Sequence, residues 1–215
     1  MVDVRLWFQK RGDARYISHL DLSRCMQRTL KRSGLPVWYT EGFNPHAYVT
    51  FALPLSLGQE SRCDIMDFRL EEEMPMQEVL CALQRVMPPN LPAVRCAAPV
   101  QKTKEIGAAA YEIRIPGRAD FLEQARLFLG RDSIVVMKRT KKGGEKELDL
   151  APFLSTANAH AQEKDLVLSV MLPAGSDSTV NPSLVVGALE DAWHTPCISR
   201  IVRLSILDKS GQDFC

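Results

Sequence analysis

Apolar and polar residues alternate along the first segment of the chain and then change to a helical period. Residues 2–9 alternate as in a strand with one buried face. Ser18 with Asp21 three residues later is typical of a helix start, and Gly34 followed by Pro36 is typical of a helix end. The side of this helix that would pack on a sheet carries Leu22, Met26, Thr29 and Leu30. The pattern therefore predicts a strand and then an amphipathic helix.

More segments with the alternation of a strand or the period of a helix follow in the first half of the chain. We expect strands or extended segments at 37–39 and 47–53 around a turn at 41–45, a strand at 65–70, a helix from Pro75 to Pro88 and a closing strand at 94–100. Together with the first strand and helix, these elements give the order β-α-β-β-α-β.

The second half repeats this order after a charged linker at 101–107. We expect a strand at 109–115, a helix at 120–129, a hairpin of 134–139 and 147–150, a strand at 166–172, a helix opened by Asn181 as N-cap and Pro182 as its first residue, and a strand at 198–207. The pattern predicts an α+β protein of two tandem ferredoxin-like (βαββαβ) domains, at 1–103 and 108–215. Each would have an antiparallel sheet with helices on one face.

Composition changes this picture only locally. The net charge is +1, which gives no general argument for nucleic acid or membrane, but basic residues exceed acidic ones by four within residues 1–58. The six cysteines lack metal-ligand spacing. No apolar run reaches the roughly 18 residues of a membrane span. We therefore expect a cytoplasmic protein with reduced thiols, no metal, no cofactor and no membrane segment.

The first helix carries a ladder of cations at spacings of three and four residues, which places them on one face. They are Arg24, Arg28, Lys31 and Arg32. Such a ladder suits successive phosphates or a carboxylate-rich partner, and arginine suits bidentate contacts with oxyanions. The alternative is a solvated face on which Asp21 pairs with the nearer arginines.

The segment 38–46 combines aromatic residues with a glycine and a proline. Aromatic rings in a loop indicate a surface on which bases or other flat groups stack. Gly42 allows main-chain conformations that other residues avoid, and Pro45 favours an extended turn. The nucleic-acid-binding candidates here are Phe43, Asn44 and His46. In the alternative, the rings belong to the core and the histidine is bonded to the main chain.

A second basic segment at 138–146 contains a Gly-Gly pair typical of a hairpin tip. Its candidate cations are Lys138, Arg139, Lys141 and Lys142. They form either a solvated tip or the extension of a cationic groove, as in tandem ferredoxin-like RNA-binding proteins, a comparison by fold analogy alone.

Motifs in the first half resemble one known family. They are Tyr16-Ile-Ser-His-Leu-Asp-Leu-Ser-Arg24, Gly34-Leu-Pro36, Glu41-Gly-Phe-Asn-Pro-His46 and Phe51-Ala-Leu-Pro-Leu-Ser-Leu-Gly58. The chain resembles the radical SAM-linked protein family, a bacterial domain of undefined function fused to or encoded beside radical SAM proteins, often with a cobalamin-binding segment. Thr40, where serine is expected, and Ala47, where proline is common, depart from the pattern.

This resemblance implies functional candidates without supplying a reaction. They are Ser18, His19, Asp21, Arg24, Arg28, Gly42, Phe43, Asn44, Pro45, His46 and Glu60, of which Ser18, Asp21, Gly42, Pro45 and Glu60 are assigned to the structure of the motif. The chain has no C-x-x-x-C-x-x-C triad for an iron–sulfur cluster, so it would serve a separately encoded radical SAM protein by binding.

Three functions stay open at this point. The first is an RNA-binding accessory protein without catalytic activity, which presents tRNA or rRNA to a radical SAM modification enzyme. The second is a metal-independent endoribonuclease that uses His19 or His46 as acid and base. The third is a protein adaptor of a radical SAM enzyme that makes no RNA contact. The basic helix and the aromatic loop together favour the first.

Overall fold

The chain divides into two compact units in the computed structural model, which describes residues 1–139 and 143–215. The first unit comprises Met1–Glu105 with Phe214–Cys215, and the second comprises Ile106–Asp213. Both have mixed α+β structure, and the strand pairings within each unit are antiparallel in the described residues. The boundary falls inside the expected linker, but the last two residues, expected in the second domain, belong to the first unit.

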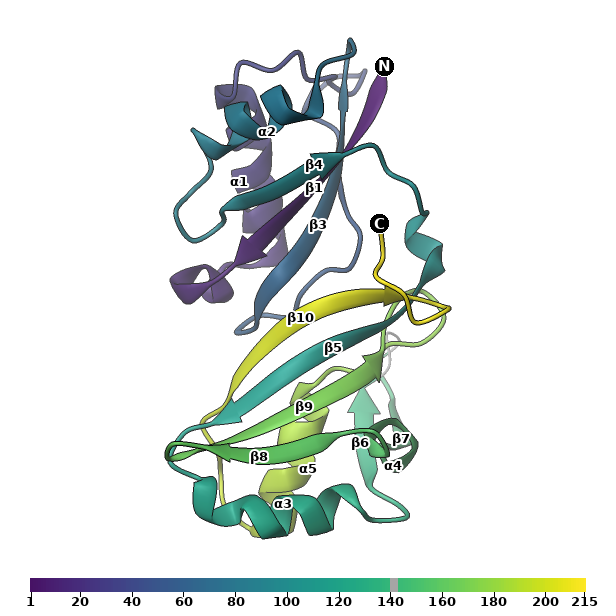
Figure 1. Ribbon diagram of the computed structural model, residues 1–215. Coiled ribbons are helices and arrows are strands. Elements are labelled where there is room, and N and C mark those ends of the chain that lie inside the picture. The colour runs from purple at the N-terminus through teal and green to yellow at the C-terminus, as the bar shows by residue number, and fades with distance from the viewer. Residues whose placement is uncertain (140–142) are drawn as a thin grey trace. The chain divides into compact units, whose positions relative to one another are not determined.

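In the first unit, two helices cover one face of an antiparallel sheet (Figure 1). Its elements are β1 (Val2–Lys10), the 3-10 helix η1 (Gly12–Tyr16), α1 (His19–Arg32), β2 (Val49–Phe51), β3 (Glu60–Leu70), α2 (Met76–Gln84), β4 (Ala93–Ala97) and the 3-10 helix η2 (Thr103–Glu105). The strand order is β4-β1-β3-β2. Helix α1 therefore connects β1 to β2, and α2 connects β3 to β4.

Alternate residues of the central strands face these helices. On β1 and β3 they are Val4, Leu6, Phe8, Met66 and Phe68, all buried. On α1 the buried residues are Leu22, Met26, Thr29 and Leu30, the set that the helical period predicts. Burial of each large apolar side chain contributes roughly 1.5–3 kcal/mol. The intervening strand residues, among them Arg5 opposite Asp67, form the helix-free face of the sheet.

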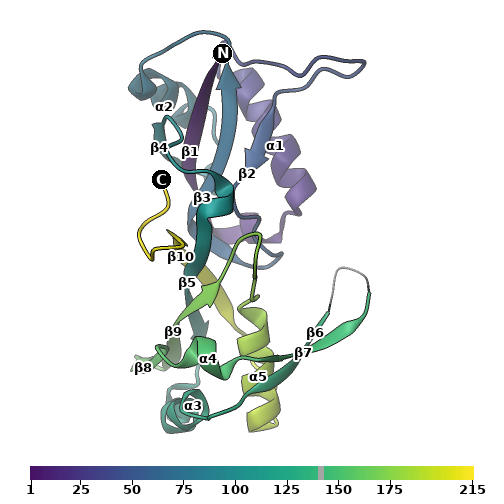
Figure 2. The same cartoon turned by 90° about the vertical axis from the view of Figure 1, so that its right-hand side faces the viewer.

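The second unit has a main sheet of strand order β10-β5-β9-β8 and a separate two-stranded sheet of β6 and β7. Its elements are β5 (Ile106–Ile115), the 3-10 helix η3 (Ala119–Phe121), α3 (Leu122–Leu129), β6 (Val135–Arg139), β7 (Glu145–Asp149), α4 (Ala151–Leu154), β8 (Asn158–Gln162), β9 (Asp165–Pro173), α5 (Ser183–Trp193) and β10 (Arg200–Asp208). Figure 2 shows the β6–β7 hairpin extending past α5.

The expected extended segments are shorter than the other strands. The segment 47–53 contains the strand β2, and Val37 and Tyr39 in the segment 37–39 form isolated bridges. The sequence did not indicate β8, which pairs with β9. Its apolar positions are Ala159 and Ala161, and alanine gives too weak a hydrophobic alternation to mark a strand.

Helix α5 begins one residue later than expected. Pro182 occupies the N-cap position, and the Ser183 N–H donates a hydrogen bond of 3.1 Å to the side-chain oxygen of Asn181. Asn181 therefore stabilises the start of the helix from one position further out. None of the helices in the described residues is long and apolar enough to cross a membrane.

Candidate functional site

Helix α1 begins with the cap that the sequence predicts. The Ser18 hydroxyl oxygen accepts a hydrogen bond of 3.1 Å from the Asp21 N–H, and the hydroxyl donates to the Asp21 carboxylate at 2.7 Å. The same carboxylate lies 3.5 Å from the Arg24 guanidinium. Both partners of this ion pair are exposed, so it contributes little to stability. Ser18 and Asp21 therefore fix the start of the helix without neutralising its other cations.

All four cations predicted on α1 are exposed. They are Arg24, Arg28, Lys31 and Arg32. Only the Arg32 guanidinium among them is bonded to the segment after α2 in the described residues, because it donates to Thr29 Oγ1 at 3.3 Å and to the Val86 oxygen at 3.4 Å. We therefore leave Arg32 out of the binding surface defined below. Residue 32 lies at the edge of the exposed side, where the segment after α2 approaches.

The turn at 40–46 is closed by its own hydrogen bonds. The Thr40 N–H donates to the His46 oxygen at 2.9 Å, and the His46 N–H donates to Thr40 Oγ1 at 3.2 Å. The His46 ring nitrogen Nδ1 lies 3.0 Å from the Asn44 oxygen. Gly42 has a φ of 133°, which favours glycine. The His46 ring is thus close to a main-chain oxygen, as in the alternative that the histidine is bonded to the main chain. This contact helps to shape the turn.

Phe43 lies in this turn and is fully exposed. The interpretation that places the ring in the core is therefore wrong for Phe43. Trp38 is half-buried, because its ring meets Tyr48 edge-on at 6.0 Å and lies 5.6 Å from the Arg69 guanidinium. Phe43 consequently offers both faces of its ring to a flat partner.

One side-chain hydrogen bond joins the turn to α1. The Gln27 amide donates to the Ala47 oxygen at 3.3 Å. At 3.6 residues per helical turn, Gln27 lies on the same stripe of α1 as Arg24 and Lys31. The bond therefore places Ala47, at the base of the turn, against α1. We call this region the cationic–aromatic surface, defined by Arg24, Arg28, Lys31, Phe43 and Asn44.

The two histidines of the motifs contact different elements. The His19 ring packs edge-on against Phe51, with 5.1 Å between ring centroids. His46 precedes Ala47, which is bonded to Gln27 further along α1. Gln27 follows His19 by eight residues, or about 12 Å of helix. Within the described residues, this arrangement does not pair the two rings as an acid and a base.

Glu60 is buried and lies in the fold rather than on the surface. Its carboxylate is 3.3 Å from Nη1 of Arg15. The Gly58 N–H donates to the Arg15 oxygen at 2.8 Å. These contacts hold the turn before α1 against the start of β3, as expected for a structural residue.

The second set of predicted cations lies on the β6–β7 hairpin. The Lys138 ammonium donates to the Thr179 oxygen at 2.5 Å. The main chain of Arg139 on β6 lies opposite that of Glu145 on β7 in the strand register. Lys141 and Lys142 lie outside the described residues. Lys138 is therefore bonded within its own unit.

A cavity of about 510 Å³ lies on the helix-free face of the first sheet. Charged residues in its lining are Asp3, Arg5, Asp67, Arg69, Lys102 and Lys104. The sequence carries part of this signal, because charged and buried apolar residues alternate along β1 and β3. The strand register decides which charges meet, and sequence reasoning therefore missed the site.

Two ion pairs form the floor of this cavity. Arg5 donates two hydrogen bonds of 2.8 Å to the Asp67 carboxylate. One row away, Arg69 Nε donates to Asp3 at 2.7 Å, and this bond raises the pKa of the guanidinium. The Arg69 guanidinium also lies 4.8 Å from the Tyr48 ring centroid. The floor is therefore a set of fixed charges rather than a collection of mobile side chains.

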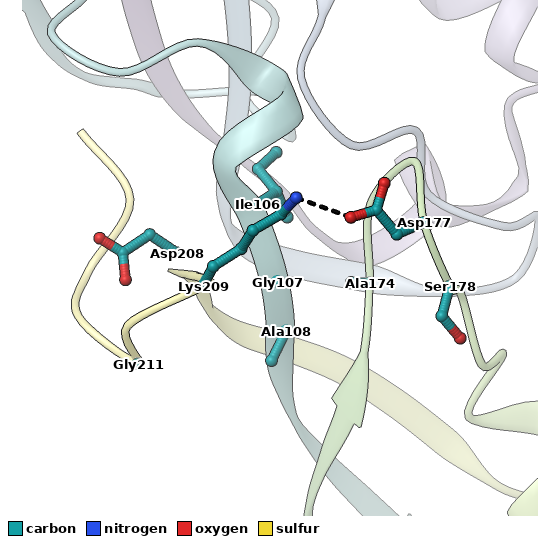
Figure 3. Close-up of a pocket in the computed structure, with 9 residues that line it drawn as sticks. All are labelled: Ile106, Gly107, Ala108, Ala174, Asp177, Ser178, Asp208, Lys209 and Gly211. Atoms are coloured by element: carbon teal, nitrogen blue, oxygen red, sulfur yellow. Dashed lines mark hydrogen bonds and ion pairs between the residues drawn. The ribbon is translucent and has the colours of Figure 1, made fainter.

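The second unit contains a smaller cavity, of about 360 Å³, beside the start of β5 and the end of β10 (Figure 3). The Lys209 ammonium reaches Asp177 at 2.6 Å, and this contact lowers the pKa of the Asp177 carboxyl. The Asp208 carboxylate accepts hydrogen bonds from the N–H groups of Ser210 and Gln212. The charged groups of this cavity are thus already bonded within the protein. It is therefore a weaker candidate for a ligand site than the first cavity.

We next consider metal ligands and reactive thiols among the described residues. No group of three His, Cys, Asp or Glu side chains there could hold a metal ion. The six cysteines are free, and burial raises the pKa of the Cys96 thiol to about 12. A thiol with this pKa stays protonated at neutral pH and is a poor nucleophile.

The fold and the surface define an α+β protein with an exposed cationic and aromatic face. A family model described as an uncharacterized protein conserved in bacteria (DUF2344) matches residues 4–182. This match covers most of the chain, and the chain belongs to the DUF2344 family. A search of curated proteins finds no match.

Proposed function

We propose that this protein binds RNA through the cationic–aromatic surface of its first unit. The complete exposure of Phe43, in a turn whose base at Ala47 is bonded to α1, is the observation that carries the proposal. An exposed phenylalanine ring gains little from water, whereas a stacked base contributes about 1–3 kcal/mol. Arg24, Arg28 and Lys31 provide the charge that a phosphate backbone requires.

The turn is shaped before any ligand binds, which supports the same proposal. Thr40 and His46 close it by two hydrogen bonds, one of them to the Thr40 hydroxyl, and Gln27 joins its base to the rigid helix α1. A ring held in this way loses less conformational freedom on binding than a ring on an unstructured loop. Single-stranded tRNA or rRNA is the class of ligand that this surface suits, because unpaired bases are free to stack.

We further propose that the two units are variants of the ferredoxin-like fold in tandem. The support is the strand order β4-β1-β3-β2 in the first unit and β10-β5-β9-β8 in the second, with helices between the corresponding strands. In this view β6, β7 and α4 are an insertion between α3 and β8. The proposed role, presenting RNA to a separately encoded radical SAM modification enzyme, rests on the resemblance of the motifs in residues 16–58.

The proposal is tested by RNA binding at two salt concentrations. Labelled tRNA and single-stranded rRNA fragments are titrated with the intact protein, and anisotropy is followed at 50 and 200 mM salt. Arg24→Ala with Arg28→Ala should weaken binding about tenfold or more and reduce the salt slope by about 1.4. Phe43→Ala should weaken binding by a similar factor with the salt slope unchanged, because stacking releases no counterions.

Arg62→Ala with Arg85→Ala is the matched control, since both arginines are exposed in the first unit and lie outside the proposed surface. It should bind RNA like the unaltered protein. Absence of RNA binding at 50 mM salt would refute the proposal. RNA cleavage in EDTA that disappears in His19→Ala or His46→Ala would instead favour the endoribonuclease. Co-purification with a radical SAM protein without RNA would favour the adaptor.

A further inference from the structure

The cavity on the helix-free face of the first unit has an anchored wall opposite its charged floor. The wall is the segment 99–104, which follows β4. The Gln101 N–H donates to the Cys215 oxygen at 2.9 Å, and the Cys215 N–H donates to the Gln101 side chain at 2.8 Å. Arg5 Nη1 donates to the same Cys215 oxygen at 2.6 Å. The wall is therefore tied to the floor by a continuous set of hydrogen bonds.

The charges of the floor are paired, whereas those of the wall are not. Asp67 is bonded to Arg5 and Asp3 to Arg69, so both lining carboxylates already have a cation. Lys102 and Lys104 are exposed, and neither ammonium has a carboxylate within 4.0 Å in the described part of the chain. Glu105 is close, and its carboxylate accepts from the Lys102 main-chain N–H at 3.3 Å. The lining keeps a positive excess.

The guanidinium of Arg69 is held in a fixed orientation at this cavity. Its Nε is held by Asp3, and its guanidinium lies 4.8 Å from the Tyr48 ring centroid and 5.6 Å from the Trp38 ring centroid. Its two terminal Nη atoms make no hydrogen bond to a described residue. A guanidinium fixed in this way presents two parallel donors, the geometry that matches two phosphate oxygens.

We propose that this cavity is a phosphate-binding site, in which Arg69, Lys102 and Lys104 bind the phosphate of a nucleotide, either free or within an RNA strand. The volume of about 510 Å³ falls in the range of small-molecule sites. Thr50, exposed on β2 beside Asp67, adds a hydroxyl donor for a phosphate oxygen. The nearby rings hold Arg69 in place, so the site recognises the phosphate more than the base.

This site differs from the cationic–aromatic surface. Helix α1 packs on the face of the sheet that carries Leu6 and Phe68, whereas the cavity lies on the face that carries Arg5 and Asp67. A free nucleotide as ligand is independent of the proposed RNA binding. An RNA strand as ligand rests on that function and would extend it to a second face of the first unit.

The test is a calorimetric titration of the intact protein with inorganic phosphate, UMP and a single-stranded RNA of 12 nucleotides. Lys102→Ala with Lys104→Ala should weaken binding of at least one of the nucleotide probes about tenfold or more. Arg69→Lys keeps the charge but loses the two parallel donors, and it should weaken the same probe about threefold or more. Lys164→Ala with Arg85→Ala removes two exposed cations elsewhere and should leave binding unchanged.

The outcomes separate the possible ligands from one another. Loss of UMP binding assigns a free nucleotide, and loss of RNA binding without any UMP binding assigns an RNA strand. Unchanged affinities in both variants, or no binding of any probe, would overturn the phosphate site. Arg24→Ala with Arg28→Ala is measured in parallel. If it leaves RNA binding intact while Lys102→Ala with Lys104→Ala abolishes UMP binding, the proposed function fails and the phosphate site stands.

Discussion

The side-chain amide of Gln27 donates a hydrogen bond of 3.3 Å to the main-chain oxygen of Ala47. It connects the middle of α1 to the end of the turn that carries Phe43. The turn follows α1 by only a short stretch of sequence, and this bond holds its base against the helix. The Gln27 amide therefore links α1 to the turn.

Replacement of Gln27 by methionine should loosen the turn while preserving α1. Methionine has a similar length and helix propensity but no donor for the Ala47 oxygen. Hydrogen exchange of the Thr40 and His46 N–H groups should become several-fold faster, because their mutual bonds then depend on the turn alone. Exchange mass spectrometry of a peptide covering residues 38–48 measures this change.

Gln77→Met is the matched control. Gln77 is an exposed glutamine of α2 whose amide reaches only the Cys81 sulfur, at 3.6 Å. This change should leave exchange at 38–48 unaffected. Equal exchange rates in Gln27→Met and the unaltered protein would show that the turn is held by its internal bonds alone.

The two ion pairs of the first sheet should differ in their contribution to stability. The side chain of Arg5 is 1% exposed and that of Arg69 is 35% exposed. Arg5→Met leaves the Asp67 carboxylate without its partner and removes a guanidinium that lies 4.7 Å from the Phe214 ring. We expect a loss of about 3 kcal/mol or more in the free energy of unfolding of the first unit.

Arg69→Met is the comparison on the same two strands. Its pair with Asp3 is partly exposed, so removal should destabilise the first unit much less than Arg5→Met does. Urea unfolding followed by tryptophan fluorescence in a Trp193→Phe background reports on the first unit, because Trp7 and Trp38 then remain. Similar losses for the two variants would show that burial does not distinguish the pairs.

Asp149 should make the stability of the second unit depend on acid pH. Its carboxylate accepts hydrogen bonds from the Ile134 N–H at 2.7 Å and the Ala151 N–H at 3.0 Å, which lower its pKa. The folded state thus favours the ionised form. The contribution is complete above the ordinary carboxyl pKa of about 3.9 and is lost as the pH falls through the lower folded value.

Asp149→Asn should therefore reduce the urea midpoint of the second unit at pH 7, and the difference from the unaltered protein should shrink below about pH 4. Trp193 fluorescence in a Trp7→Phe, Trp38→Phe background follows this unit. Asp132→Asn, at an exposed position of the same unit, serves as the control. A difference that is constant from pH 7 to pH 3 would contradict the role of the charged form.

Much of the first unit could be predicted because its signals are local. The cap at Ser18, the left-handed Gly34 and the four buried residues of α1 follow from helical period and capping chemistry. Strand β8 could not be predicted, because its inward position is an alanine whose burial is decided by its neighbour β9. The cations of α1 were visible in the sequence, but the hydrogen bond from Arg32 to the Val86 oxygen was not.

The sequence by itself determined the alternation of elements, the exposed cations of α1 and the shape of the turn around Gly42. Each depends on residues within a few positions of one another. Only the tertiary structure decided that Arg5 meets Asp67 and Asp3 meets Arg69, and that Gln101 bonds to Cys215 at the edge of the same cavity. These partners lie 62 or more residues apart. The register between β1 and β3 brings the two ion pairs together. The Gln101–Cys215 contact forms because the C-terminal residues pack against the first unit. The local sequence pattern predicts neither.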